Sequence, residues 1–311
     1  MKINKNTFII SDEILLDIKK YETIAIDFAI QEGVLIRLLQ IDLINSPNLK
    51  LLLACDPEII DLKNCICNLD ILRFFPFIQN IIISVKSCQP LTSIQQLSNI
   101  NYLKSFTLYG YIKNINLDVL DKFTGQIEFL DIDNMNINKK KYSIINKNPL
   151  KKLALAKLDL SLIENNENLT ELKIYHELLY EELLHEKFPN LNSLTLINCN
   201  KVTNFSAITK MNNLKELTIN TVKNFTIMPT VPSNQLEKLA ILNNKNFESF
   251  ANFNDFQHLK ELSLTNTKIR SKTIENILTS LPIKRLNFYS QNKDEQKAVE
   301  DLIRKYNLTQ K

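Results

Sequence analysis

One spacing pattern constrains the fold of this chain more than any other feature of its sequence. Apolar residues recur at the first, fourth and sixth positions of a short segment, as in "LNSLTL" from Leu191, "LKELTI" from Leu214 and "LKELSL" from Leu259. The other copies begin at Ile78, Leu103, Ile127, Leu150, Leu169, Leu236 and Ile283. Successive copies start 19 to 25 residues apart, a period typical of stacked repeat architectures.

The spacing within each copy indicates one short strand per repeat. Side chains alternate between the two faces of a strand, so positions four and six share one face, and the first apolar residue turns into the same interior. Burying one Leu or Ile completely is worth about 1.5–3 kcal/mol. A single unit cannot bury its own apolar face, but stacked units share a continuous core. We therefore predict an elongated repeat structure.

On these ten copies the chain resembles leucine-rich-repeat proteins, whose unit of about 20–29 residues carries an L-x-x-L-x-L-x-x-N/C-x-L core. The resemblance implies an α/β fold: a right-handed solenoid, or horseshoe, with a parallel β-sheet on its concave face. The convex side would mix helical, 3₁₀ and extended segments, with helical caps at both ends. In this family the ninth position is buried, and Asn there bonds neighbouring backbones. That position here holds Met135, Leu158, Cys199, Val222, Asn244 and Thr267, which predicts an irregular member and makes Cys199 a buried, inert thiol.

The segments between copies predict a varied convex side. Residues 267–282 place Ile274, Ile277, Leu278 and Leu281 at helical spacing, and residues 176–188 also indicate a helix. Four Phe residues between 247 and 256 recur every three residues, which suits a 3₁₀-like backing. We interpret this aromatic row as core filling, with an exposed binding strip as the alternative.

The sequence indicates three regions. Residues 1–48 are an N-terminal capping region with a degenerate first repeat from Tyr21, residues 49–289 hold the repeats, and residues 290–311 form a C-terminal capping helix. Ser11 would cap the first helix, and Asn292 with Glu295 suits a capping box at the last one. Residues 55–77 fit the repeat badly and indicate an irregular insertion.

Composition limits the kinds of partner. The 38 basic and 34 acidic residues leave a net charge of +4, too little for a nucleic-acid footprint, which needs basic residues gathered on one face. No apolar run reaches the roughly 18 residues of a membrane span, and the apolar stretch near the N-terminus is too short for a signal peptide. Five cysteines with irregular spacing argue against a disulfide framework. We expect a cytoplasmic protein, and delivery into a host by a secretion system that needs no signal peptide stays open.

The sequence offers little catalytic chemistry. Three widely separated glycines exclude a dinucleotide fingerprint and a phosphate-binding P-loop. His176, Glu181 and His185 could serve a metal-dependent hydrolase, but zinc sites normally need three or four ligands in a recognised arrangement. Cys65 and Cys67 lack the C-x-x-C spacing of zinc or redox motifs. We therefore predict no enzyme, no cofactor and no metal site.

The third, fifth and seventh positions of each copy would point out of the concave face. We predict that aromatic and charged side chains there form the partner-binding surface: Tyr109, Phe129, Asp131, Asp133, Lys152, Lys173, Tyr175 and Tyr289. Aromatic anchors beside charges are typical of protein-binding hot spots. The leading hypothesis is a monomeric, non-enzymatic module that binds a protein, either a microbial effector or an intracellular regulator. The alternative is a ubiquitin-ligase adaptor, because residues 11–21 faintly resemble the first helix of an F-box.

Overall fold

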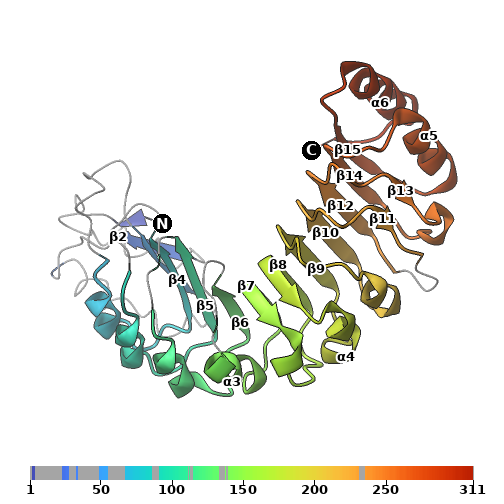
Figure 1. Ribbon diagram of the computed structural model, residues 1–311. Helices are drawn as coiled ribbons and strands as arrows, with labels where there is room; N and C mark the ends of the chain where they lie inside the picture. Colours follow the sequence, from blue (N-terminus) through green and yellow to red (C-terminus); the bar gives the residue numbers. More distant parts are fainter. Residues whose placement is uncertain are drawn as a thin grey trace. The chain divides into compact units, whose positions relative to one another are not determined.

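The computed structural model describes residues 2–3, 23–27, 33, 49–54, 67–85, 91–110, 112, 115–132, 137, 139–230 and 235–310. The chain divides into two compact units, Met1–Leu150 and Lys151–Lys311. Each unit is built from repeated strands with short segments behind them (Figure 1). The three regions predicted from the sequence stay a prediction.

The first unit contains a parallel sheet in the order β1-β2-β3-β4-β5-β6. Its strands are β1 (Lys2–Ile3), β2 (Thr23–Asp27), β3 (Lys50–Ala54), β4 (Asn80–Val85), β5 (Ser105–Gly110) and β6 (Phe129–Ile132). The connecting helices are short: η3 (Asp70–Phe74), η4 (Gln95–Asn99), η5 (Asp118–Phe123), η6 (Lys139–Lys141) and α3 (Tyr142–Asn146).

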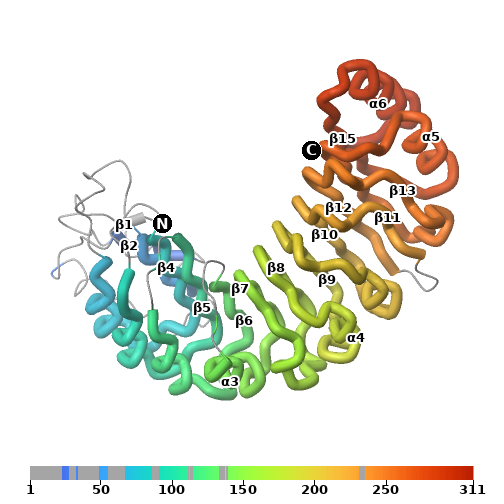
Figure 2. Tube along the Cα trace, in the orientation of Figure 1, coloured from blue at the N-terminus to red at the C-terminus, as the bar shows by residue number. Residues whose placement is uncertain are grey.

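The second unit contains a parallel sheet in the order β7-β8-β9-β10-β12-β14-β15, and a two-stranded parallel sheet, β11-β13, lies among the connecting segments (Figure 2). The strands are β7 (Lys152–Asp159), β8 (Glu171–Leu179), β9 (Ser193–Ile197), β10 (Glu216–Asn220), β11 (Ile227–Met228), β12 (Lys238–Leu242), β13 (Ser249–Phe250), β14 (Glu261–Thr265) and β15 (Arg285–Tyr289). The helices are η7 (Leu160–Leu162), η8 (Glu181–Leu183), α4 (Leu184–Lys187), η9 (Ser206–Lys210), η10 (Phe253–Asp255), α5 (Ser271–Ser280) and α6 (Lys293–Lys305).

Each of the ten sequence copies contributes a strand that begins at its third position. Leu191, Leu194 and Leu196 are each at most 1% exposed, and Leu194 and Leu196 lie in register with Leu217 and Ile219 on the next strand. Strict alternation puts these residues on the core face of every strand. The copies thus stack their apolar positions into one continuous layer within each unit, as the spacing predicted.

The convex segments fill the rest of the core. Phe205, Phe225, Phe247, Phe250 and Phe256 form a chain of ring contacts with centroids 4.7 to 6.0 Å apart. Phe247 and Phe256 are fully buried, and Phe250 is half-buried. Core filling is therefore the main role of this aromatic row. Helix α5 forms as predicted, with Ile274, Ile277 and Leu278 buried.

The helix predicted over residues 176–188 is wrong in its first part. Strand β8 continues to Leu179, because Leu178 is buried in register with Leu158 on a long β7. The pairing shifts by a bulge between Leu155 and Lys157, which keeps the apolar alternation on the core face. Tyr180 then adopts a left-handed conformation with φ 58°, and only a short helical stretch follows.

Helix α6 follows the last strand of the second unit. Asn292 caps it, as predicted, because its Oδ1 accepts hydrogen bonds from the backbone N–H groups of Asp294 and Glu295. The reciprocal bond of a capping box is not made: the Glu295 carboxylate accepts from the Ser271 N–H at the start of α5, at 2.6 Å. Glu295 thereby joins the two helices. In the described part of the chain, no helix is long and apolar enough to cross a membrane.

Candidate protein-binding surface

The positions between the buried ones make up the sheet face opposite the core, here called the open face. Strand β9 shows the pattern: Leu194 and Leu196 are buried, whereas Ser193, Thr195 and Ile197 are half-buried. The same alternation holds in β10, β12 and β14. Because the strands are parallel and in register, each open-face position forms a row across neighbouring repeats.

In the first unit, the structure brings Tyr109, Phe129 and Asp131 together on strands β5 and β6. The Tyr109 hydroxyl donates a hydrogen bond to Asp131 Oδ2 at 3.1 Å, and Asp131 lies opposite Thr107 in the register. All three predicted residues are half-buried, so the Phe129 ring is not fully exposed. Asp133 lies outside the described residues.

In the second unit, Lys152, Lys173 and Tyr175 lie on neighbouring strands β7 and β8. Lys152 Nζ pairs with the Glu171 carboxylate at 2.6 Å, so its charge is compensated within the sheet. Lys173 Nζ lies 4.7 Å from the centre of the Tyr175 ring, a distance suited to a cation–π interaction. Small Ala154 and Ala156 beside them are almost fully buried.

Tyr289 lies at the far end of the same sheet, on β15, and is 53% exposed. The open face between Tyr175 and Tyr289 carries mainly small or uncharged side chains at the fifth and seventh positions: Thr195, Ile197, Thr218, Asn220, Ala240, Leu242, Ser263, Thr265 and Asn287. The second unit thus presents two separate aromatic positions with a low-relief surface between them. A single patch uniting Tyr109, Phe129 and Asp131 with the residues of the second unit stays a prediction.

Left-handed turns end four successive strands of the second unit, and the sequence analysis missed them. Asn198, Thr221, Asn243 and Asn266 occupy the eighth position of their repeats with φ between 51° and 56°. Asn adopts this conformation more readily than most residues, so the recurring Asn at position eight was the available signal. The Asn266 amide donates to Asn243 Oδ1 at 2.8 Å, which ties adjacent turns together.

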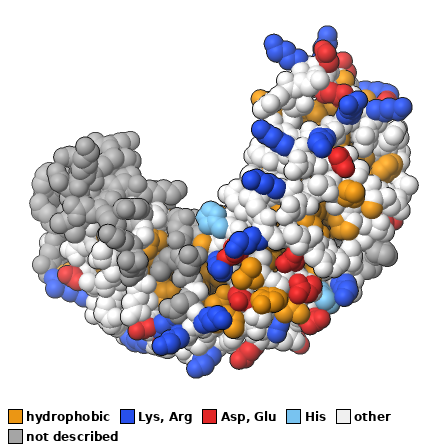
Figure 3. Space-filling view, in the orientation of Figure 1, with side chains coloured by type: hydrophobic (Ala, Val, Ile, Leu, Met, Phe, Trp, Pro, Cys, Tyr) orange, Lys and Arg blue, Asp and Glu red, His pale blue; other side chains and the backbone are white. Residues whose placement is uncertain are grey.

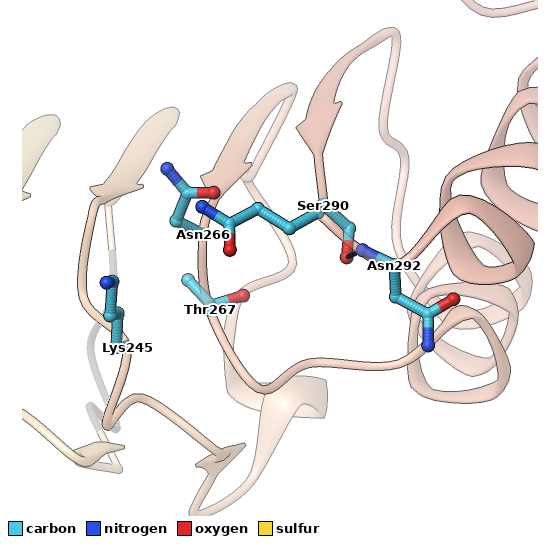
Figure 4. A pocket seen from close by; sticks show the side chains of 6 residues that line it. Lys245, Asn266, Thr267, Ser290 and Asn292 are labelled. Atoms are coloured by element: carbon cyan, nitrogen blue, oxygen red, sulfur yellow. Dashed lines mark hydrogen bonds between the residues drawn. The ribbon is translucent and has the colours of Figure 1, made fainter.

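The strand ends also enclose a small open hollow of about 180 Å³. It is lined by Lys245, Asn266, Thr267, Ser290, Gln291 and Asn292 (Figure 4). The Ser290 hydroxyl accepts a hydrogen bond from the Asn292 N–H at 3.2 Å, which holds the entry to helix α6. The lining is polar throughout, so the hollow suits a polar or charged group rather than an apolar one.

Cys199 is a core residue, as predicted. Its thiol is fully buried and donates to the Ile174 carbonyl at 3.5 Å. Burial raises the pKa of Cys199 to about 12, which leaves the reactive thiolate essentially absent near neutral pH. Asn244 occupies the same ninth position in another repeat. Its Oδ1 accepts a hydrogen bond from the Val222 N–H at 2.6 Å, and its amide donates to the Ile219 carbonyl at 3.0 Å.

His176, Glu181 and His185, the residues considered for a metal-dependent hydrolase, are not arranged as a metal site. The Glu181 carboxylate is buried and accepts two hydrogen bonds from the backbone N–H groups of Thr203 and Asn204, each at 2.9 Å. His176 lies in β8 and His185 in α4, so the three residues do not share one helix face. Across the described ranges, no group of three or more His, Cys, Asp or Glu side chains could hold a metal ion. Residues 11–21, which suggested an F-box helix, lie outside the described residues.

No family model and no curated protein match the sequence. Among solved structures, the chain is similar to an internalin (inlF) of Listeria monocytogenes, with a TM-score of 0.56 and 16% identity, covering 97% of this chain and 88% of that chain. A leucine-rich-repeat protein of Leptospira interrogans gives a TM-score of 0.39 and 15% identity, covering 93% of this chain and 95% of the other. Identity this low shows the fold alone. Together with the registered repeats, the likeness to the internalin establishes a leucine-rich-repeat fold, with a parallel sheet and mixed helical, 3₁₀ and extended backing.

Proposed function

We propose that this chain is a non-enzymatic module that binds a protein partner through the open face of its repeats. The observation that carries the proposal is the composition of that face, where half-buried aromatic and charged side chains interrupt rows of small ones. Tyr109, Phe129 and Asp131 form one such group, and Lys173 with Tyr175 forms another. Pre-ordered aromatic side chains lose little conformational entropy on binding, which suits a hot spot.

The repeat fold supports this role because it presents a broad surface without a closed cleft. Each repeat contributes one short strand to the sheet, so the surface extends with the number of repeats. Action in the cytoplasm, either as a regulator or as an effector delivered into a host cell, belongs to the same proposal. A monomeric state is also part of it.

Affinity capture tests the proposal. Wild-type chain is compared with Asp131→Lys/Tyr175→Ala, which changes one group on the open face of each unit, and with Tyr175→Ala alone. The matched control is Tyr102→Ala/Glu186→Lys, whose positions are exposed but lie outside the strands. Circular dichroism and thermal melts first establish that each variant is folded.

We expect a protein that is captured by wild type and by the control to be lost from the double variant. Alanine substitution of a hot-spot aromatic typically costs about 2 kcal/mol or more, a loss of about 30-fold in affinity. Equal capture by all folded variants would remove the open face from consideration.

A further inference from the structure

The charged side chains at the strand starts of the second unit are paired across neighbouring repeats. Lys238 Nζ lies 2.6 Å from Glu216, and Arg285 lies 3.0 Å from Glu261. One position earlier, Lys260 Nζ lies 2.8 Å from Glu237. These pairs alternate in sign from strand to strand, so most of the charge at this edge is compensated. The exposed Lys215 and Lys284 of the same edge have no carboxylate within 4.0 Å among the described residues.

The segments that follow the strand ends of the same unit carry charged side chains of one sign. Five successive repeats place a lysine two or three residues after their eighth position. These residues, here called the basic edge, are Lys201, Lys223, Lys245, Lys268 and Lys293. All five are exposed. The corresponding segments, 198–201, 221–224, 243–246, 266–269 and 290–293, contain no Asp or Glu. Figure 3 shows Lys and Arg side chains gathered over the C-terminal part of the chain, with fewer acidic side chains among them.

Contacts between neighbouring turns show that the basic edge is continuous. The Asn246 amide donates to the Lys223 carbonyl at 3.0 Å, and the Lys268 N–H donates to the Phe247 carbonyl at 2.8 Å. Lys245 and Asn292, the residue before Lys293, line the same hollow (Figure 4). Strands in a sheet lie about 4.8 Å apart, so the lysines follow one another at roughly that interval.

Three of the five lysines make no ion pair in the described part of the chain, although Lys293 is followed directly by Asp294 and Glu295. Lys201 shares the Glu177 carboxylate with Lys157, and Lys268 makes one exposed pair with Glu248 at 3.5 Å. Among the residues that the structure describes, Lys223, Lys245 and Lys293 have no carboxylate within 4.0 Å. At the strand starts, by contrast, Lys238, Lys260 and Arg285 each pair with an acid of the preceding repeat. The basic edge therefore keeps a positive charge that only solvent or another molecule can compensate.

We propose that the basic edge binds an acidic segment of a partner protein. Carboxylates on one side of a helix lie about 5–6 Å apart at i, i+3 or i, i+4, and those on one side of an extended segment lie about 7 Å apart. Both spacings are within reach of flexible lysines at about 4.8 Å intervals. The polar hollow beside Lys245 accepts one acidic side chain of that segment. This surface is separate from the open face, so the inference does not depend on the role proposed for that face.

A nucleic acid fits this edge less well. Proteins that hold single strands combine basic residues with aromatic side chains on which bases stack. The five segments of the basic edge contain no aromatic residue, and the Phe rings behind three of the turns are turned into the core. An oligonucleotide would therefore gain mainly phosphate contacts, since the exposed Tyr289 beside Ser290 offers a stacking position at one end of the edge.

The test is a binding titration with the full chain and a labelled 16-residue peptide of alternating Glu and Ser, followed by fluorescence anisotropy at low and moderate salt. The variant is Lys223→Gln/Lys245→Gln/Lys293→Gln, which removes the three lysines of the basic edge that make no ion pair among the described residues. The matched control is Lys210→Gln/Lys272→Gln/Lys297→Gln, which removes the same charge from exposed positions in η9, α5 and α6. A Gln–Ser peptide and an oligothymidine of equal charge complete the set.

We expect the edge variant to bind the acidic peptide about tenfold more weakly than wild type, since three exposed ion pairs contribute together. The control triple variant should change binding less than twofold, and the Gln–Ser peptide should not bind. Moderate salt should weaken wild-type binding because exposed charges are screened. Equal losses in the two triple variants, or tighter binding of oligothymidine than of the acidic peptide, would overturn the proposal.

Discussion

Replacing Thr221 with Asn should stabilise the second unit. Thr221 adopts φ 56° at the same point of the turn where the neighbouring repeats have Asn198, Asn243 and Asn266. A left-handed conformation costs an ordinary residue about 1–2 kcal/mol, and a β-branched side chain is among the least suited to it. The Thr221 hydroxyl recovers part of this cost by donating to Asn220 Oδ1 at 2.9 Å.

The net gain follows from these two contributions. Asn removes most of the conformational cost of about 1–2 kcal/mol but gives up the hydroxyl's hydrogen bond, worth about 0.5–1.5 kcal/mol. We expect Thr221→Asn to raise the free energy of unfolding by about 0.5 kcal/mol. The reverse change, Asn243→Thr, should lower it by about 1–3 kcal/mol, because it adds the strain and also breaks the bonds that Asn243 makes to neighbouring turns.

Urea denaturation of the full chain, followed by circular dichroism, measures both changes as shifts of the transition midpoint at constant slope. Thr221→Ala is the control, since it removes both the β-branch and the hydroxyl but lacks the polar side chain that favours the left-handed conformation in Asn. It should be less stable than Thr221→Asn. If Thr221→Asn proves destabilising while Asn243→Thr is neutral, strain at position eight does not limit the stability of this unit.

Three further predictions concern the core, one ion-pair group and one thiol. Leu194→Ala should lower the free energy of unfolding by about 2–5 kcal/mol, whereas Thr195→Ala on the open face should change it by no more than about 0.5 kcal/mol; comparable losses in urea melts would contradict the assigned register. Hydrogen bonds from the Lys157 and Lys201 side chains hold the pKa of Glu177 below its usual value. Wild type should therefore be more stable than Glu177→Gln at any pH above the ordinary Glu pKa. This extra stability is lost as the pH falls through the lowered pKa of Glu177. Melts should show the full difference at pH 7 and a progressively smaller one as the pH is lowered below the ordinary Glu pKa of about 4.3. Cys199 should resist alkylation in the native protein at pH 8 and react in urea, as followed by peptide mass spectrometry; rapid native labelling would refute its burial.

The repeat spacing predicted the fold because it is a property of many residues at once. Ten copies with the same three apolar positions leave one arrangement in which all of them are buried, so errors at single positions do not matter. The interpretation of residues 176–188 had no such agreement among copies to support it. Leu178, Leu179, Leu183 and Leu184 suit a helix as well as a strand, and pairing with β7 decides between the two in the folded chain.

The candidate surface was only partly predictable, for a related reason. Position within the repeat identified which side chains leave the core, as Tyr175 and Tyr289 show. It did not reveal which charges are already compensated: the pairing of Lys152 with Glu171 depends on side-chain conformations across two strands. Net charge was a poor guide for the same reason: the value of +4 does not show that Lys238 and Lys260 are paired while Lys223 and Lys245 make no ion pair among the described residues.

Stacking explains why the turn asparagines and the basic edge recur together. A residue preference at one position of the repeat becomes a row about 4.8 Å apart in the folded protein, so even a weak preference acquires a collective effect. Asn at position eight meets the requirement of the left-handed turn, and that turn directs the following residues past the end of the sheet into solvent. A lysine there lies beyond reach of the acids at the strand starts, which are used by Lys238, Lys260 and Arg285. The same geometry that closes each repeat thus leaves Lys223, Lys245 and Lys293 without an ion pair among the described residues.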